Sequence, residues 1–226
     1  MKATGRKAGA QTTFYMTRIS ERHRSNANYA DLPLRDHEQI AATASRIEHG
    51  VDADEREELQ TNSGINGESC LLGIDSLIWP WCFPIDIMHV LYENIMPQLL
   101  ALWQGTYKTG QTLGSSKAKH QDAFVIPKGV WATIAKEISK SNHTTPAQTA
   151  PRVGNITKKS FWTAETYSYF LMFLGPVVLK GRLPAPYYAH FILFSEIAKR
   201  MTSQEISYQE LPVLHSKIVV WVKAFE

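Results

Sequence analysis

WPWCFPIDIMHVLYENIMPQLLALW, residues 79–103, is the most apolar and aromatic long stretch of this chain, and it decides the predicted fold. No lysine or arginine occurs between Thr61 and Gly105. An apolar stretch without basic residues is typical of a segment that folding removes from water. We therefore expect residues 79–103 to form the buried centre of the protein.

Two ionisable side chains, Asp86 and His89, interrupt this stretch. Pro84 is compatible with the first turn of a helix, where its missing N–H costs nothing. A helix that starts there places Asp86 near its N-terminus, where exposed N–H groups favour a carboxylate. His89 and Glu93 follow at intervals of three and four residues, so the three side chains share one face of the helix.

The Asp86–His89 pair has two interpretations. In the structural one, Asp86 is the N-terminal carboxylate of the helix and His89 is a core histidine bonded to it. In the functional one, Asp86, His89 and Glu93 are metal ligands, because charges inside a protein are usually paired or bound to a metal. The spacing alone is compatible with both.

Length and composition narrow the classes of protein. The 226 residues, 44% of them apolar, suit one large globular domain or two small ones. No apolar run reaches the ~20 residues that span a bilayer, and the basic start precedes no apolar signal segment. Cys70 and Cys82, the only cysteines, do not form a disulfide scaffold or a four-cysteine zinc site. We expect a non-secreted, intracellular protein with no membrane partner.

Charge is distributed in blocks. Residues 1–24 and 106–162 are basic, whereas residues 25–60 are acidic. Basic blocks favour contact with a polyanion such as DNA, although they are also common in solvated tails and loops. The candidate nucleic-acid-binding residues are Lys117, Lys119, Lys158 and Lys159.

The remaining pattern predicts a mainly α fold of about six helices around an apolar central helix. Residues 1–27 are expected to be a disordered basic tail, and residues 28–226 a single helical region with loops near 106–126 and 141–158. Pro97 should kink or divide the central helix. Cys70 to Trp79 fits a short strand or an extended loop. The other predicted helices are Asp36–His49, an acidic extension Val51–Gln60, Lys128–Ser139, Phe161–Leu174 with an end or kink at Gly175-Pro176, Pro184–Met201, and a last helix that follows the capping-box spacing of Ser207 and Glu210.

The last helix carries a continuous apolar stripe that runs to the end of the chain. A stripe of this kind needs a partner surface. We expect that partner to lie outside the chain, so that the protein self-associates through its C-terminal helix. The stripe consists of Leu214, Ile218, Trp221, Val222 and Phe225.

Several short segments, taken in order, resemble transposase-domain proteins of the CACTA (En/Spm-like) DNA transposon superfamily, in the form abundant in fungal genomes. The resemblance spans residues 28–226, and FPIDIMH contains the D-x-M-H pattern that Asp86 and His89 match. The segments are NYADLPLRDHE (28–38), GINGES (64–69), FPIDIMH (83–89), ENI (93–95), LWQG (102–105), LGP (174–176) and YYAHF (187–191).

The resemblance implies an origin in an RNase H-like transposase core, which uses metal-bound acidic residues to cut and join DNA. The family's first acidic motif and its C-x-x-C element are expected upstream of Asn28, and nothing there matches either. We therefore expect an internal, catalytically incomplete piece of a transposase. Magnesium or manganese would be needed only by a complete site.

Three functions follow as hypotheses. The first is residual binding to DNA or to another transposase chain, in the nucleus. The second is a helical protein-interaction module. The third is a small metal-dependent enzyme that uses Asp86, His89 and Glu93.

Overall fold

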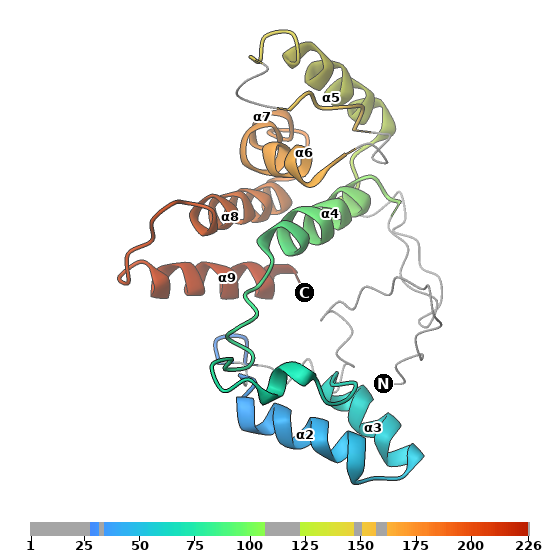
Figure 1. Cartoon of the computed structure of the whole chain (residues 1–226). Coiled ribbons are helices and arrows are strands. Elements are labelled where there is room, and N and C mark those ends of the chain that lie inside the picture. The colour runs from blue at the N-terminus through green and yellow to red at the C-terminus, as the bar shows by residue number, and fades with distance from the viewer. Residues whose placement is uncertain (1–27, 32–33, 107–122, 147–150, 157–161, 226) are drawn as a thin grey trace. The chain divides into compact units, whose positions relative to one another are not determined.

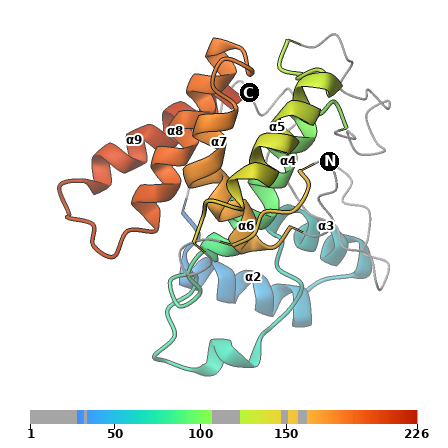
Figure 2. The ribbon, with the colours of Figure 1, turned by 90° about the horizontal axis from the view of Figure 1, so that it is seen from above.

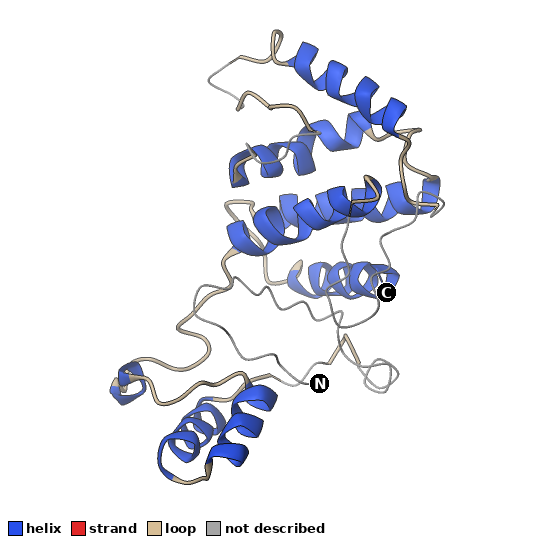
Figure 3. Cartoon of the chain, turned by 90° about the vertical axis from the view of Figure 1, so that its right-hand side faces the viewer, coloured by secondary structure: helices blue, strands red, loops and turns tan. Residues whose placement is uncertain are grey.

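The computed structural model describes residues 28–31, 34–106, 123–146, 151–156 and 162–225 (Figure 1). These residues are mainly helical and contain no strand, as predicted (Figure 3). The chain divides into two compact units between Ile85 and Asp86, where we expected a single helical region. The predicted disordered tail lies outside the described residues. No helix in the described ranges combines the length and the apolar character that crossing a membrane requires.

The first unit contains a helical hairpin, α2 (His37–His49) and α3 (Ala53–Ser63). Asp36 caps α2 by accepting hydrogen bonds from the backbone N–H groups of Glu38 and Gln39 at 2.9 and 3.1 Å, which confirms the predicted start of this helix. Gly50 follows its last residue. The buried side chains of the hairpin all come from α2 and are Ile40, Ala44 and Ile47.

The acidic helix α3 is also confirmed, although it buries none of its side chains. Asp52 caps its N-terminus, and Gly64 ends it in the left-handed conformation at φ 72°, which glycine adopts without steric cost. The Arg46 guanidinium forms an ion pair with the Glu55 carboxylate across the hairpin. Caps and surface charges therefore hold α3 in place.

Residues 70–85 form a loop. It opens with a single 3₁₀ turn, Cys70–Gly73, and continues through further turns, so the extended-loop alternative is the one observed. The backbone N–H of Trp79 donates to the His37 imidazole Nδ1 at 3.1 Å, which ties the loop to α2. Within the loop, the Trp79 and Phe83 rings meet edge to face at 4.7 Å.

The second unit begins with one continuous helix that changes register. A π-helical segment, Met88–Ile95, runs directly into α4 (Met96–Trp103), and Pro97 stands in the first turn of α4. The expected kink or division at Pro97 is therefore wrong. The N–H of Met96 bonds to the carbonyl of Leu91, five residues back. This wider turn relieves the clash that proline makes with the carbonyl four residues before it in an α-helix.

A second π-helical segment precedes a second proline in the same way. The predicted helix 161–174 is observed as α6 (Ala164–Tyr169) followed by the π-helical segment Phe170–Leu174, and it continues through Gly175-Pro176 as α7 (Gly175–Val178). A Cβ atom at Gly175 would lie 2.5 Å from the Phe191 ring, so this position has room only for glycine. The helix therefore neither ends nor breaks at Gly175.

Three further helices complete the second unit, and all were predicted: α5 (Lys128–Ser141), α8 (Ala185–Met201) and α9 (Leu211–Phe225). The first π-helical segment packs on α6, the second packs on α8, α5 lies against α7, and α8 and α9 run side by side (Figure 2). A fork of two hydrogen bonds from Arg182 to Glu137, at 2.5 and 2.6 Å, holds the turn after α7 to α5.

The core of this unit is aromatic. Phe170, Phe191 and Phe194 are fully enclosed, and the Trp103 ring meets Phe191 edge to face at 5.4 Å. The second half of the long apolar stretch thus lies in the core, as predicted. The first half does not. Its exposed apolar side chains are Trp81, Phe83, Ile85, Met88 and Val90.

The expectation that the C-terminal stripe lacks a partner within the chain is also wrong. Trp221 is only 8% exposed and stacks on Phe194 of α8 at 4.8 Å. The other stripe residues are partly buried against the same core. The Ser207–Glu210 capping spacing is confirmed, because the Glu210 carboxylate accepts from the Ser207 N–H at 3.0 Å.

Candidate functional site

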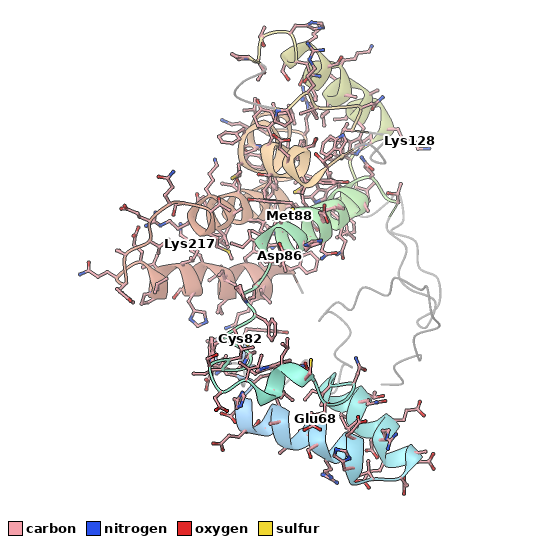
Figure 4. The ribbon with its side chains drawn as sticks, viewed as in Figure 1. Glu68, Cys82, Asp86, Met88, Lys128 and Lys217 are labelled. Atoms are coloured by element: carbon pink, nitrogen blue, oxygen red, sulfur yellow. The ribbon has the colours of Figure 1, made fainter. Side chains whose placement is uncertain are left out.

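Asp86 and His89 lie at the start of the second unit, where the chain enters the π-helical segment (Figure 4). The carbonyl of Asp86 accepts the N–H of Val90 at 3.0 Å, so the helix begins after Asp86 and not at Pro84. One Asp86 carboxylate oxygen accepts from the His89 backbone N–H at 3.2 Å, and the other lies 2.6 Å from His89 Nδ1. Asp86 therefore caps the helix and orients the histidine ring.

Glu93 completes a row of three charged groups. One of its carboxylate oxygens lies 3.5 Å from His89 Nε2, so the imidazole stands between two carboxylates, with one on each ring nitrogen. The hydrogen bond from Asp86 is the main reason that the pKa of His89 is raised, with Glu93 adding to it. The same hydrogen bond is the main cause that lowers the pKa of Asp86. The arrangement favours a protonated, doubly paired imidazolium.

The exposure of these groups differs from the prediction. His89 and Asp86 are 57% and 56% exposed, so the expected buried core histidine is wrong. Their charges stay in contact with water and need neither burial nor a metal to be accommodated. What the spacing predicted correctly is the side-chain bond between residues three apart on one helical face.

The geometry has a consequence for metal binding. A histidine binds a metal through a ring nitrogen that carries no proton, and here each nitrogen faces a carboxylate. The two carboxylates lie at different nitrogens of one ring and do not converge on a common point. Within the described residues, no three His, Cys, Asp or Glu side chains are grouped closely enough to hold a metal ion. Asp86, His89 and Glu93 thus form an ion-paired helix start.

The predicted nucleic-acid contacts, Lys117, Lys119, Lys158 and Lys159, lie outside the described residues. The neighbouring described chain is basic at its surface. Helix α5 exposes Lys128, Lys136 and Lys140, and Arg152 is exposed between the two undescribed segments at 147–150 and 157–161.

A shallow groove between α8 and α9 is a second feature of the unit. Its charged lining residues largely pair with one another, because Lys217 lies 2.9 Å from Glu196 and Arg200 pairs with Glu210. Lys199 lies over the Phe173 ring at 5.7 Å. These pairs hold the two helices together and leave few charges for a ligand.

Two features were missed at the level of sequence. One is the exposure of the first half of the apolar stretch, for which Pro80 and Pro84 were a usable signal, because they prevent a regular helix or strand that could bury one face. The other is the stack of His190 on Trp221, at 4.8 Å between ring centroids, with His190 Nε2 donating to the Trp221 carbonyl at 3.0 Å. Burial lowers the pKa of His190.

Comparison of the chain with protein-family models, curated proteins and solved structures gives no match.

Proposed function

We propose that this chain is a transposase-derived protein of the CACTA (En/Spm-like) type that acts by binding and not by cutting DNA. The ordered sequence segments around D-x-M-H support the origin. The observation that carries the loss of cutting is the arrangement at this motif, in which Asp86 caps a helix and His89 is held between two carboxylates. Two-metal nucleases instead need several carboxylates that converge on the ions.

The binding partner that the charge distribution favours is DNA. The basic block 106–162 supplies both the candidate lysines and the exposed basic residues of α5. Contacts from lysine and arginine to phosphates are independent of base sequence and weaken with salt. Binding is accordingly nonspecific and strongly salt-dependent.

Two assays test the proposal. Incubation of supercoiled plasmid with the protein and Mg²⁺ or Mn²⁺ should give no nicking above background. Nicking that Asp86→Ala abolishes would contradict the proposal. Binding to a random duplex should weaken with salt, and replacing the four candidate lysines with glutamine should reduce the slope by ~0.9 for each phosphate that the variant no longer neutralises. An unchanged slope would place the DNA-binding surface elsewhere.

A protein-interaction module is the second candidate function. One observation favours it: the first half of the apolar stretch is exposed in the described chain, and exposed apolar side chains that cluster mark contact sites for other proteins.

A further inference from the structure

We propose that the protein self-associates through a reciprocal contact, in which the apolar loop of each copy packs on the outer face of α9 of the other. The apolar loop is residues 74–85, and its exposed apolar side chains are Ile74, Ile78, Trp81, Phe83 and Ile85. The outer face of α9 is Val213, Val220 and Lys223. This inference does not depend on a transposase origin.

The apolar loop has the composition of a contact surface. Five large apolar side chains are exposed within twelve residues, and Trp81 is 68% exposed. Single exposed apolar residues are normal on a protein surface, but a run of them is unfavourable unless something covers it. Tryptophan and phenylalanine are also enriched at the centres of protein interfaces. A partner that covers the loop is therefore expected to be apolar itself.

The outer face of α9 offers an apolar surface of matching size. Val213 and Val220 are seven residues apart, so both point to the same side of the helix, away from the buried Trp221. Lys223 follows Val220 by one turn and is exposed. In the described residues Lys223 has no ion pair, whereas Lys217 on the same helix is paired with Glu196.

Charge selects the occupant. The loop lies in the segment 61–105, which contains no lysine or arginine, and its one charged residue is Asp75. Helix α9, from 211 to 225, contains no aspartate or glutamate. The two surfaces are thus complementary both in apolar character and in the sign of charge. An anionic membrane surface is a poorer match for the loop, because such surfaces attract basic segments.

Both complementary surfaces belong to the same chain, which points to a second copy as the partner. In a two-fold dimer the same contact forms twice, once in each direction. The loop of one copy meets α9 of the second, and the loop of the second meets α9 of the first. This predicts an unusual result when two defective variants are mixed.

The test is sedimentation velocity of the full chain over a range of concentrations. Trp81→Ser with Phe83→Ser removes the loop surface, and Val213→Ser with Val220→Ser removes the α9 surface. Each double variant alone should associate about tenfold or more weakly than the original protein, since every interface then buries two fewer apolar side chains. A mixture of the two variants should recover association, because one intact loop and one intact α9 then meet.

Two controls make the result specific. Val177→Ser with Tyr208→Ser changes two exposed side chains elsewhere and should leave association unchanged. Circular dichroism should show the same helix content in all variants. Should an apolar variant fail to fold, a charge exchange replaces it. Asp75→Lys and Lys223→Glu should each weaken association alone, and the mixture should restore it by forming both contacts with exchanged charges.

Several outcomes would overturn the proposal. A chain that stays monomeric at every concentration has no such contact. A loop variant that loses association while the α9 variant retains it would show a loop-to-loop contact, and the opposite result would show contact between two α9 helices. A mixture that associates no better than its components would exclude the reciprocal arrangement. None of these measurements contains DNA, so they succeed or fail independently of the proposed DNA binding.

Discussion

The two halves of the long apolar stretch have similar compositions and opposite environments. Trp81, in the first half, is 68% exposed, whereas Trp103, in the second half, is 3% exposed. Residues 79–86 form turns and extended chain, and residues 88–103 form a helix packed on α6. Asp86, the capping residue, marks the change from one half to the other.

The difference shows that apolar composition does not by itself bury a segment. Burial requires a regular element that presents its apolar side chains on one face to a neighbouring element. Pro80 and Pro84 interrupt the first half, so its side chains point in several directions. The second half keeps its helix through Pro97 because the preceding π-helical turn accommodates the proline.

The largest expected effect is on the two tryptophans. Trp103→Ala should reduce the free energy of unfolding by about 3–5 kcal/mol, because it leaves a cavity against Phe191. Trp81→Ala should change it by no more than about 0.5 kcal/mol, as is usual for exposed positions. Urea denaturation of both variants measures the contrast. Equal losses would show that both halves of the stretch are buried.

A smaller effect concerns pH and the packing of α8 on α9. The pKa of His190 is lowered from 6.5 by burial, so folding favours the neutral ring. Stability should therefore be complete above pH 6.5 and should decrease as the pH falls through the lower pKa of the folded state. Thermal unfolding between pH 7 and pH 5 follows this change.

The control for this pH dependence lies on the same hairpin. His190→Gln should remove most of the acid-dependent loss of stability, whereas His215→Gln on exposed α9 surface should keep it. A His190→Gln variant with the acid sensitivity of the original protein would show that another group is responsible.

The smallest effect is expected at the junction between the two halves. The pKa of His89 is raised above 6.5, so its contribution to stability is present below pH 6.5 and is lost as the pH rises through the folded-state value. The pKa of Asp86 is lowered below 3.8, so its contribution is present above pH 3.8 and is lost in stronger acid. The pair should stabilise the helix start most between pH 3.8 and pH 6.5, and only slightly, because both groups are exposed.

Titration of the His89 ring by NMR detects this interaction directly. Asp86→Asn should lower the pKa of His89, because the main hydrogen bond to the carboxylate is removed, and Glu93→Gln should lower it less. The exposed Asp75→Asn provides a control and should have no effect. A His89 pKa that is indifferent to Asp86→Asn would mean that the pair does not form in solution.

Local signals allowed most helices to be predicted from sequence. Asp36 and Gly50 bound α2 because a cap and a stop are encoded by single residues, and α5 and α8 follow from apolar periodicity. At the candidate site, the Asp86–His89 bond was predictable from a spacing of three residues. Its exposure was not, because exposure depends on which elements cover a segment, and periodicity does not report this.

The same reasoning explains the errors at α9 and at the prolines. The stripe on α9 was recognised, but its partner on α8 could be found only from the tertiary arrangement that stacks Trp221 on Phe194. Pro97 and Pro176 are helix breakers by local rules, and the π-helical turns before them overcome the clash. The packing of the surrounding helices selects this solution.

Hydrogen exchange, measured by mass spectrometry at low and high protein concentration, tests the central contrast most directly. At low concentration, amides of 91–103 should exchange slowly and those of 79–86 rapidly, because only the former belong to a packed helix. At high concentration, 79–86 and the outer face of α9 should become protected together, while 91–103 stays unchanged. Equal protection of the two halves in the dilute protein would contradict the account, because it would place the whole stretch in the core.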